Sequence, residues 1–176
     1  MRSRSFPVKP LNAQGLERLA LRYVERFATT RGRLTDYLTR KIRERGWEGA
    51  PADPQALAER MAGLGYIDDR AWAEAKASSL ARRGLGERRV ADAFRQARIA
   101  EEDAEAVAPG VQARAVESAL AFARRRRIGP FAEAPADRPL REKQIAAMVR
   151  GGHAFALARR IADMAPGDEI DDFGLE

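Results

Sequence analysis

The chain has 176 residues, of which 45% are hydrophobic and 33% charged, a composition typical of one or two folded domains rather than of a disordered protein. It has no cysteine, which excludes disulfides, thiolate catalysis and cysteine-ligated zinc or iron–sulfur centres. No apolar run approaches the ~18 residues of a membrane span, and residues 1–10 lack the apolar stretch of a secretory signal. We therefore expect a cytoplasmic protein that makes no membrane contact.

The net charge is +6 and is concentrated near the N-terminus. Residues 1–50 contain twelve Lys and Arg against five Asp and Glu, whereas residues 51–108 carry a net −2 and residues 109–176 a net +1. Basic charge attracts polyanions through counterion release. A GC-rich coding bias also favours arginine beside alanine, so the charge by itself does not establish a nucleic-acid partner.

Eight stretches have apolar residues at the i, i+3, i+4 spacing of an amphipathic helix, and none shows sustained alternation, so we expect helices and no strands. The stretches are 16–27, 34–42, 57–64, 72–80, 90–97, 116–123, 145–149 and 157–164. Turn chemistry separates them, at Gly32, Gly46, Gly63 with Gly65, Gly84 with Gly86, Pro109-Gly110 and Gly151-Gly152. The acidic, apolar-poor tail 166–176 is expected to be disordered.

An internal repeat is visible at an offset of 52 residues. Leu38, Ile42 and Trp47 map onto Val90, Phe94 and Ile99, and Arg31-Gly32 maps onto Arg83-Gly84; a third copy places Gly152-His153 where Gly46-Trp47 stand in the first. A period of this length suits three helices per unit. We predict an all-α protein of three tandem three-helix units, 11–64, 65–108 and 109–165, forming an elongated, curved array with a long binding face.

The middle unit contains the most specific sequence motifs. Gly65-Tyr66-Ile67-Asp68-Asp69, the helix residue Trp72, and the turn around Gly84 and Gly86 between Arg82 and Val90 resemble the RecX family, bacterial regulators of the RecA recombinase. The resemblance runs from about residue 16 to residue 164. The chain departs from the family at Arg98, where a glycine usually precedes the aliphatic residue, and at Leu34, where a serine cap is frequent.

The resemblance implies a non-enzymatic regulator without cofactors, and we expect the protein to be a monomer. It implies binding to the RecA–single-stranded-DNA filament and inhibition of the ATPase, strand-exchange and coprotease activities. Single- or double-stranded DNA is a further candidate partner. The alternative is a general helical nucleic-acid-binding protein that acts without RecA. No nucleophile–base pair, phosphate loop or metal cluster supports an enzyme.

Two arginine groups are candidates for contacts with an acidic partner or with phosphate. Arg82, Arg83, Arg88 and Arg89 lie on both sides of one turn, which brings their heads together, and Arg95 follows on the same helix. The run Arg124, Arg125, Arg126 and Arg127 ends a helix, where positive charge is also favourable for purely structural reasons.

The remaining conspicuous residues have structural interpretations. Asp68 and Asp69 open a helix, so capping and helix-dipole stabilisation outweigh a metal site or an acid–base pair. His153 takes the place of Trp47 and Ile99 in the repeat and is expected to pack. Gly84-Leu85-Gly86 is expected to be an interhelical turn, with free N–H groups near Arg88 as a weaker alternative. We expect Tyr66, Trp72 and Trp47 to pack in the core rather than to stack on bases.

Overall fold

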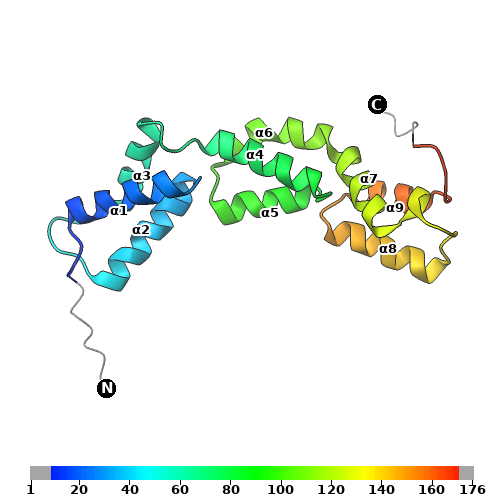
Figure 1. Cartoon of the computed structure of the whole chain (residues 1–176), viewed down its shortest axis with the longest axis horizontal. Helices are drawn as coiled ribbons and strands as arrows, with labels where there is room; N and C mark the ends of the chain where they lie inside the picture. The colour runs from blue at the N-terminus through cyan, green and yellow to red at the C-terminus, as the bar shows by residue number, and fades with distance from the viewer. Residues whose placement is uncertain (1–8, 171–176) are drawn as a thin grey trace, which may run out of the picture. The chain divides into compact units, whose positions relative to one another are not determined.

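A computed structural model describes residues 9–170, and this part of the chain is all-helical, as predicted (Figure 1). It forms nine α-helices and one 3-10 helix, and its single β-type contact is an isolated parallel bridge between Leu11 and Trp47. The helices are α1 (Ala13–Arg26), α2 (Arg31–Arg45), α3 (Pro54–Gly63), α4 (Asp69–Arg82), α5 (Glu87–Ala97), α6 (Glu101–Ala113), α7 (Ala115–Arg126), α8 (Arg138–Arg150) and α9 (Phe155–Ala162), with η1 (Gly129–Phe131) before α8.

The chain divides into two compact units. The first contains the residues up to Trp72 together with Ala97–Ala100, and the second contains Ala73–Gln96 and the residues from Glu101 onward. The boundaries therefore fall inside α4 and at the end of α5. The division into three helical units that the repeat suggests stays a prediction.

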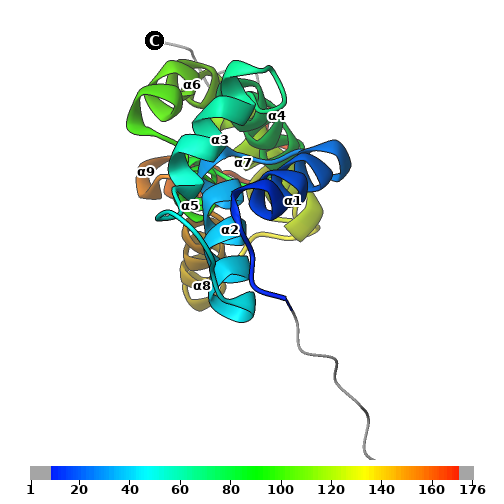
Figure 2. The same cartoon turned by 90° about the vertical axis from the view of Figure 1, so that its left-hand side faces the viewer.

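In the first unit, α1, α2 and α3 pack against one another (Figure 2). Each helix begins with a side-chain cap: Asn12 accepts the Gly15 N–H, Thr30 accepts the Arg33 N–H and Asp53 accepts the Ala56 N–H. These caps satisfy backbone donors that have no partner within the helix. The apolar faces meet in one core, formed by Leu11, Leu16, Ala20, Leu34, Leu38, Leu57, Ala58, Met61 and Ile67.

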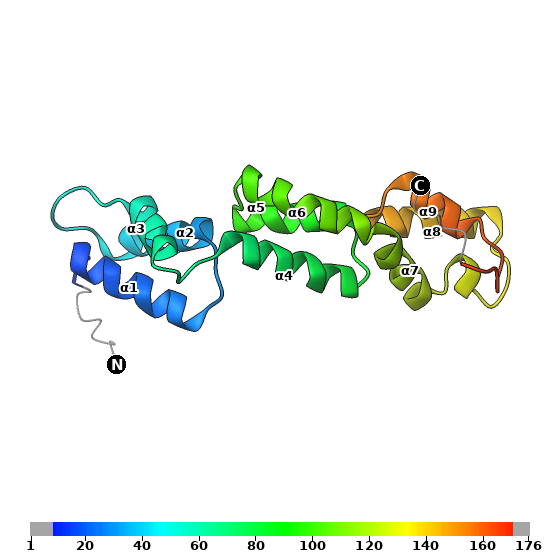
Figure 3. The ribbon, with the colours of Figure 1, turned by 90° about the horizontal axis from the view of Figure 1, so that it is seen from above.

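In the second unit, α7, α8 and α9 enclose a separate core (Figure 3). Phe122 from α7, Met148 from α8 and Ile161 from α9 are buried there. The short helix η1 closes one side, where a β-carbon on Gly129 would lie 1.9 Å from the Ile161 carbonyl oxygen, so this site admits only glycine. Within residues 9–170, no helix is both long and apolar enough to cross a membrane.

Two predicted breaks are wrong. Gly32 lies in the first turn of α2, and Pro109 and Gly110 lie inside α6. Pro109 removes only one helical hydrogen bond, and the buried Val107 anchors the helix just before it. The predicted tail falls mostly on residues 171–176, outside the described residues; Gly167 at its start donates its N–H to the Pro130 carbonyl at 3.0 Å.

Three residues that the sequence alignment pairs share one backbone property at the helix ends. Gly46, Arg98 and Gly152, which the 52-residue offset and the third copy make equivalent, all have a positive φ, of 81°, 53° and 99°. A residue with positive φ commonly follows the last turn of a helix, although Gly46, with ψ 169°, lies outside the left-handed helical region. Arg98 is therefore held in a conformation that a side chain disfavours.

Candidate interaction surface

The Gly65–Trp72 motif is a helix-ending turn followed by a helix cap. Gly65, with φ +81°, donates its N–H to the Ala62 carbonyl, and Tyr66 donates its N–H to the Met61 carbonyl at 3.0 Å. Asp68 Oδ1 accepts the Ala71 N–H at 2.8 Å at the start of α4. The motif thus ends α3 and starts α4, and Asp68 has the predicted capping role.

Asp69 does not share that role. Its side chain is buried and accepts two hydrogen bonds from Arg31, from the backbone N–H at 2.9 Å and from Nε at 3.0 Å. Arg31 also pairs with Glu59 at 3.2 Å. The hydrogen bond that Arg31 donates to Asp69 is the main reason that the pKa of the Arg31 guanidinium lies above its usual value. Asp69 therefore ties the start of α4 to the start of α2.

Other contacts converge on the same end of α2. Thr30 donates its hydroxyl to the Ala97 carbonyl, and Arg98 forms an ion pair with Asp36. The Arg33 guanidinium lies 4.8 Å from the centre of the Trp72 ring. Trp72 is half-buried beneath a cation rather than enclosed in the core. Sequence analysis missed this cluster, because its members are 38 to 67 residues apart.

The aromatic residues divide differently from the prediction. Tyr66 is 49% exposed, so its expected place in the core is wrong. Trp47 is half-buried and packs against the core of the first unit, as predicted, and it donates its Nε1–H to the Ala50 carbonyl at 2.7 Å. Phe27, at the end of a predicted apolar stripe, is 53% exposed.

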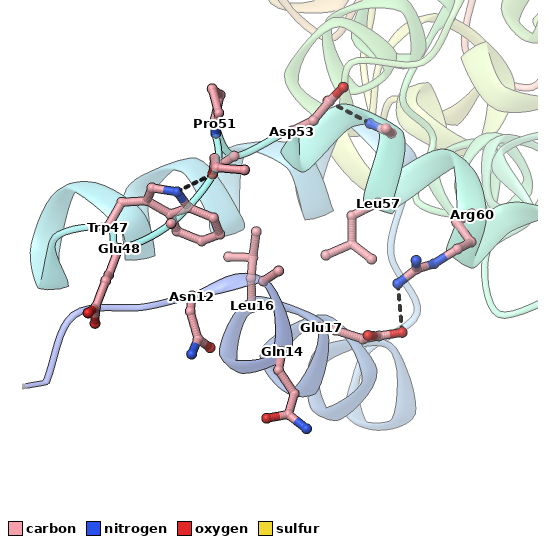
Figure 4. Close-up of a pocket in the computed structure, with 15 residues that line it drawn as sticks. Asn12, Gln14, Leu16, Glu17, Trp47, Glu48, Pro51, Asp53, Leu57 and Arg60 are labelled. Atoms are coloured by element: carbon pink, nitrogen blue, oxygen red, sulfur yellow. Dashed lines mark hydrogen bonds and ion pairs between the residues drawn. The ribbon is translucent and has the colours of Figure 1, made fainter.

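A cavity of about 690 Å³ adjoins Trp47 in the first unit (Figure 4). Leu16 and Leu57 contribute apolar walls, and Glu17 and Arg60 form an ion pair of 2.6 Å across one side. Asn12 and Asp53, which also line it, are occupied as helix caps. These four polar side chains are thus engaged in structural contacts. Between residues 9 and 170, no three His, Asp or Glu side chains lie together as a metal site requires.

In the second unit the turn between α4 and α5 packs on the turn between α8 and α9. Gly86 donates its N–H to the Gly151 carbonyl at 2.9 Å, and Arg88 donates its N–H to the Gly152 carbonyl at 3.2 Å. The expectation of free N–H groups beside Arg88 is therefore wrong. A β-carbon on Gly86 would lie 2.4 Å from the Gly152 carbonyl oxygen, which explains the glycine.

His153 completes this contact. The ring is buried, lies edge-on to Phe122 with centroids 5.4 Å apart, and has Nε2 3.1 Å from the Gly84 carbonyl. Because a carbonyl only accepts, Nε2 carries the hydrogen. Burial lowers the pKa of the imidazole, and the hydrogen bond to Gly84 opposes that shift. The packing role predicted for His153 is what the structure shows.

The structure brings one arginine of the second predicted group to the first. A β-carbon on Gly84 would lie 2.4 Å from Nη2 of Arg125, so the Arg125 guanidinium rests against the turn that follows Arg83. Arg82, Arg83 and Arg88 are exposed beside the same turn, and Arg89 donates its Nε–H to the Arg150 carbonyl at 2.9 Å. We call these five the turn arginines: Arg82, Arg83, Arg88, Arg89 and Arg125.

The other candidate arginines have local partners. Arg124 lies over Phe131 at 4.9 Å, Arg126 lies over Phe122 at 5.7 Å, and Arg127 pairs with Glu133. Arg95 pairs with Asp92. Of the four arginines at the end of α7, Arg125 thus lies against the turn between α4 and α5, and the other three contact residues near them in the sequence.

Comparison with known proteins covers most of the chain. No family model matches. The chain is 33% identical over 162 residues to the regulatory protein RecX of Myxococcus xanthus (strain DK1622), which is 86% of each chain. It is 29% identical over 157 residues to the regulatory protein RecX of Agrobacterium fabrum (strain C58 / ATCC 33970), which is 87% of this chain and 84% of that protein. With this coverage, and with the turn and cap that the resemblance rested on present in the structure, the chain belongs to the RecX family.

Proposed function

We propose that this protein inhibits a RecA recombinase by binding the RecA–single-stranded-DNA filament, and that it thereby suppresses ATPase activity, strand exchange and coprotease activity. It acts as a binding protein, without a catalytic step and without a cofactor, from the cytoplasm. The relatives named RecX support the link to RecA. The observation that supports a surface contact is the group of turn arginines on a turn held by backbone hydrogen bonds.

The turn arginines suit a partner that carries carboxylates or phosphates. Guanidinium groups pair with both in a forked geometry, and the turn beneath them is rigid because its backbone donors are satisfied. The remaining candidates, Arg95 and Arg124, Arg126 and Arg127, are secondary contacts at most, since each already has a partner within the chain.

The test is a titration of RecA ATPase activity on single-stranded DNA with a triple variant, Arg82→Gln, Arg83→Gln and Arg88→Gln. Arg89 and Arg125 are left in place because they contact the fold. At about 0.5 kcal/mol for each exposed ionic contact, the concentration for half inhibition should rise about tenfold. Far-ultraviolet circular dichroism should be unchanged.

The matched control removes three exposed positive charges elsewhere: Arg43→Gln, Arg138→Gln and Lys143→Gln. It should inhibit like the unmodified protein, and equal effects from both triple variants would show that only net charge matters. Adding the protein before and after filament assembly then separates blocked assembly from action on a finished filament. Affinity for naked DNA equal to that for RecA-coated DNA would favour the general nucleic-acid binder instead.

A further inference from the structure

Three aromatic side chains form a continuous row on α1 and α2 that the proposed function does not use. The rings of Tyr37 and Tyr23 are stacked, with centroids 4.3 Å apart and planes 24° apart. Phe27, one helical turn beyond Tyr23, continues the row with a centroid 5.2 Å from that ring. We call Phe27, Tyr23 and Tyr37 the aromatic row.

The row is anchored at one end and open at the other. Tyr23 and Tyr37 pack against the core of the first unit, which fixes their planes. Phe27 is 53% exposed, so much of its ring has no protein neighbour. Neither tyrosine hydroxyl is hydrogen-bonded to another residue between 9 and 170. An exposed aromatic face held on a rigid base is suited to a planar ligand.

Positive charge accompanies the row along its length. Arg26 lies 5.8 Å from the Phe27 ring, while Arg40 and Lys41 lie 5.7 Å and 5.8 Å from the Tyr37 ring. Residues 13–45, which span both helices, carry nine Arg and Lys against four Asp and Glu. Aromatic rings between cations are the pattern by which proteins bind single-stranded nucleic acid, with bases on rings and phosphates on cations.

One acidic residue, Glu44, partly neutralises this positive charge. Glu44 accepts a hydrogen bond from Lys41 Nζ at 2.6 Å and lies 3.6 Å from Arg40 Nε. A phosphate near Tyr37 has to compete with Glu44 for these two cations. Arg26, at the exposed end, has only its contact with the Phe27 ring among the described residues.

We propose that the aromatic row is a stacking site for single-stranded nucleic acid, with one base on Phe27 and flanking phosphates on Arg26 and on Arg40 with Lys41. This goes beyond the regulation of RecA, because the site binds nucleic acid with no recombinase present. Duplex DNA is excluded from stacking, since its bases have no free face.

The experiment measures fluorescence anisotropy of a labelled oligothymidylate at low salt with the full-length protein and without RecA. The variant Phe27→Leu keeps an apolar side chain but removes the ring, and affinity should fall about fivefold or more, as for loss of a base–aromatic stack. Phe155→Leu is the matched control, because Phe155 is 62% exposed on α9 and lies outside the row; it should leave affinity unchanged. Glu44→Gln should strengthen binding.

Two further readouts decide between stacking and simple charge attraction. An oligonucleotide carrying 5-iodouracil should form a photochemical cross-link to a peptide that contains Phe27 or Tyr23. Binding to a duplex should be unaffected by Phe27→Leu. Equal loss from Phe27→Leu and Phe155→Leu, no loss from either, or no measurable binding of the oligothymidylate would overturn the proposal. So would a Phe27→Leu defect confined to binding of free RecA, which would assign the row to a protein.

Discussion

Adjacent residues at the start of α4 have separate structural roles. Consecutive helical side chains point about 100° apart, so Asp68 reaches back to its own helix while Asp69 points toward α2. The Asp68 side chain and its capping hydrogen bond are exposed to solvent, whereas the Asp69 side chain is buried. The pair offers a controlled comparison of capping with a buried ionic contact.

Asp69→Asn should lower the free energy of unfolding by about 2 kcal/mol. The amide removes the negative charge that Arg31 faces, and breaking one partner of a buried pair leaves the other poorly compensated; partial exposure of Arg31 keeps the loss below that of a fully buried pair. Asp68→Asn should cost only a few tenths of a kcal/mol, since asparagine also caps helices well. Urea unfolding measures both, and equal losses would contradict the assignment.

His153 makes stability depend on pH. Its pKa is lower in the folded protein than in the unfolded chain, so the unfolded chain binds the proton first. Stability should therefore be complete above about pH 6.5, the ordinary value, and should fall as the pH drops below it, by at most about 1.4 kcal/mol per pH unit. Urea unfolding at a series of pH values tests this.

The control for that experiment is simple because His153 is the single histidine of the chain. His153→Gln retains an N–H that can reach the Gly84 carbonyl but does not titrate. Its stability should be nearly flat between pH 7 and pH 5.5. A slope as steep as that of the unmodified protein would mean that other groups cause the dependence.

At the scale of elements, the ends of α2, α5 and α8 each have a residue with a positive φ, and of these three only α5 places a side chain there. Arg98 has a φ of 53°, where a glycine would carry no strain. A left-handed conformation costs an ordinary residue about 1 kcal/mol relative to glycine. The contact that Arg98 gains, an ion pair with Asp36, is largely exposed and contributes little.

Arg98→Gly should therefore raise the free energy of unfolding by about 0.5 kcal/mol, after the greater freedom of glycine in the unfolded chain is subtracted. Arg98→Ala is the control, because it removes the ion pair but keeps the β-carbon and its strain. Chemical unfolding of both variants separates the two effects. If alanine stabilised as much as glycine, strain at this position would not be the cause.

Helices were predictable from sequence wherever apolar spacing and a cap agreed. At the start of α3, for example, Asp53 is the cap and Pro54 stands in the first turn, the usual residue types for these places. Pro109-Gly110 misled because α6 continues through both residues, although proline inside a helix removes a backbone hydrogen bond and crowds the preceding turn. Gly32 misled because it serves close packing: a β-carbon there would lie 2.3 Å from the Arg98 β-carbon.

At the scale of the whole molecule, sequence predicted the fold class and the family but not which surfaces meet. The bond from Thr30 to Ala97 and the contact of His153 with Gly84 join residues 67 and 69 positions apart. Apolar periodicity says which face of a helix is buried, not against what. Four of the turn arginines, Arg82, Arg83, Arg88 and Arg89, could be grouped from the sequence because they flank one turn. Arg125 was a candidate in a separate group, and only the fold brings it to this turn.

The meeting of Gly86 with Gly152 has a consequence for how such a protein changes over generations. The hydrogen bonds that Gly86 and Arg88 donate across this junction are main chain to main chain, so they do not depend on the side chains at positions 82, 83 and 88. The exposed residues at positions 82, 83 and 88 can therefore be substituted as a partner surface changes, while the backbone hydrogen bonds of the junction stay in place. The two glycines themselves cannot change in this way, since any larger residue at either one would force the backbones apart.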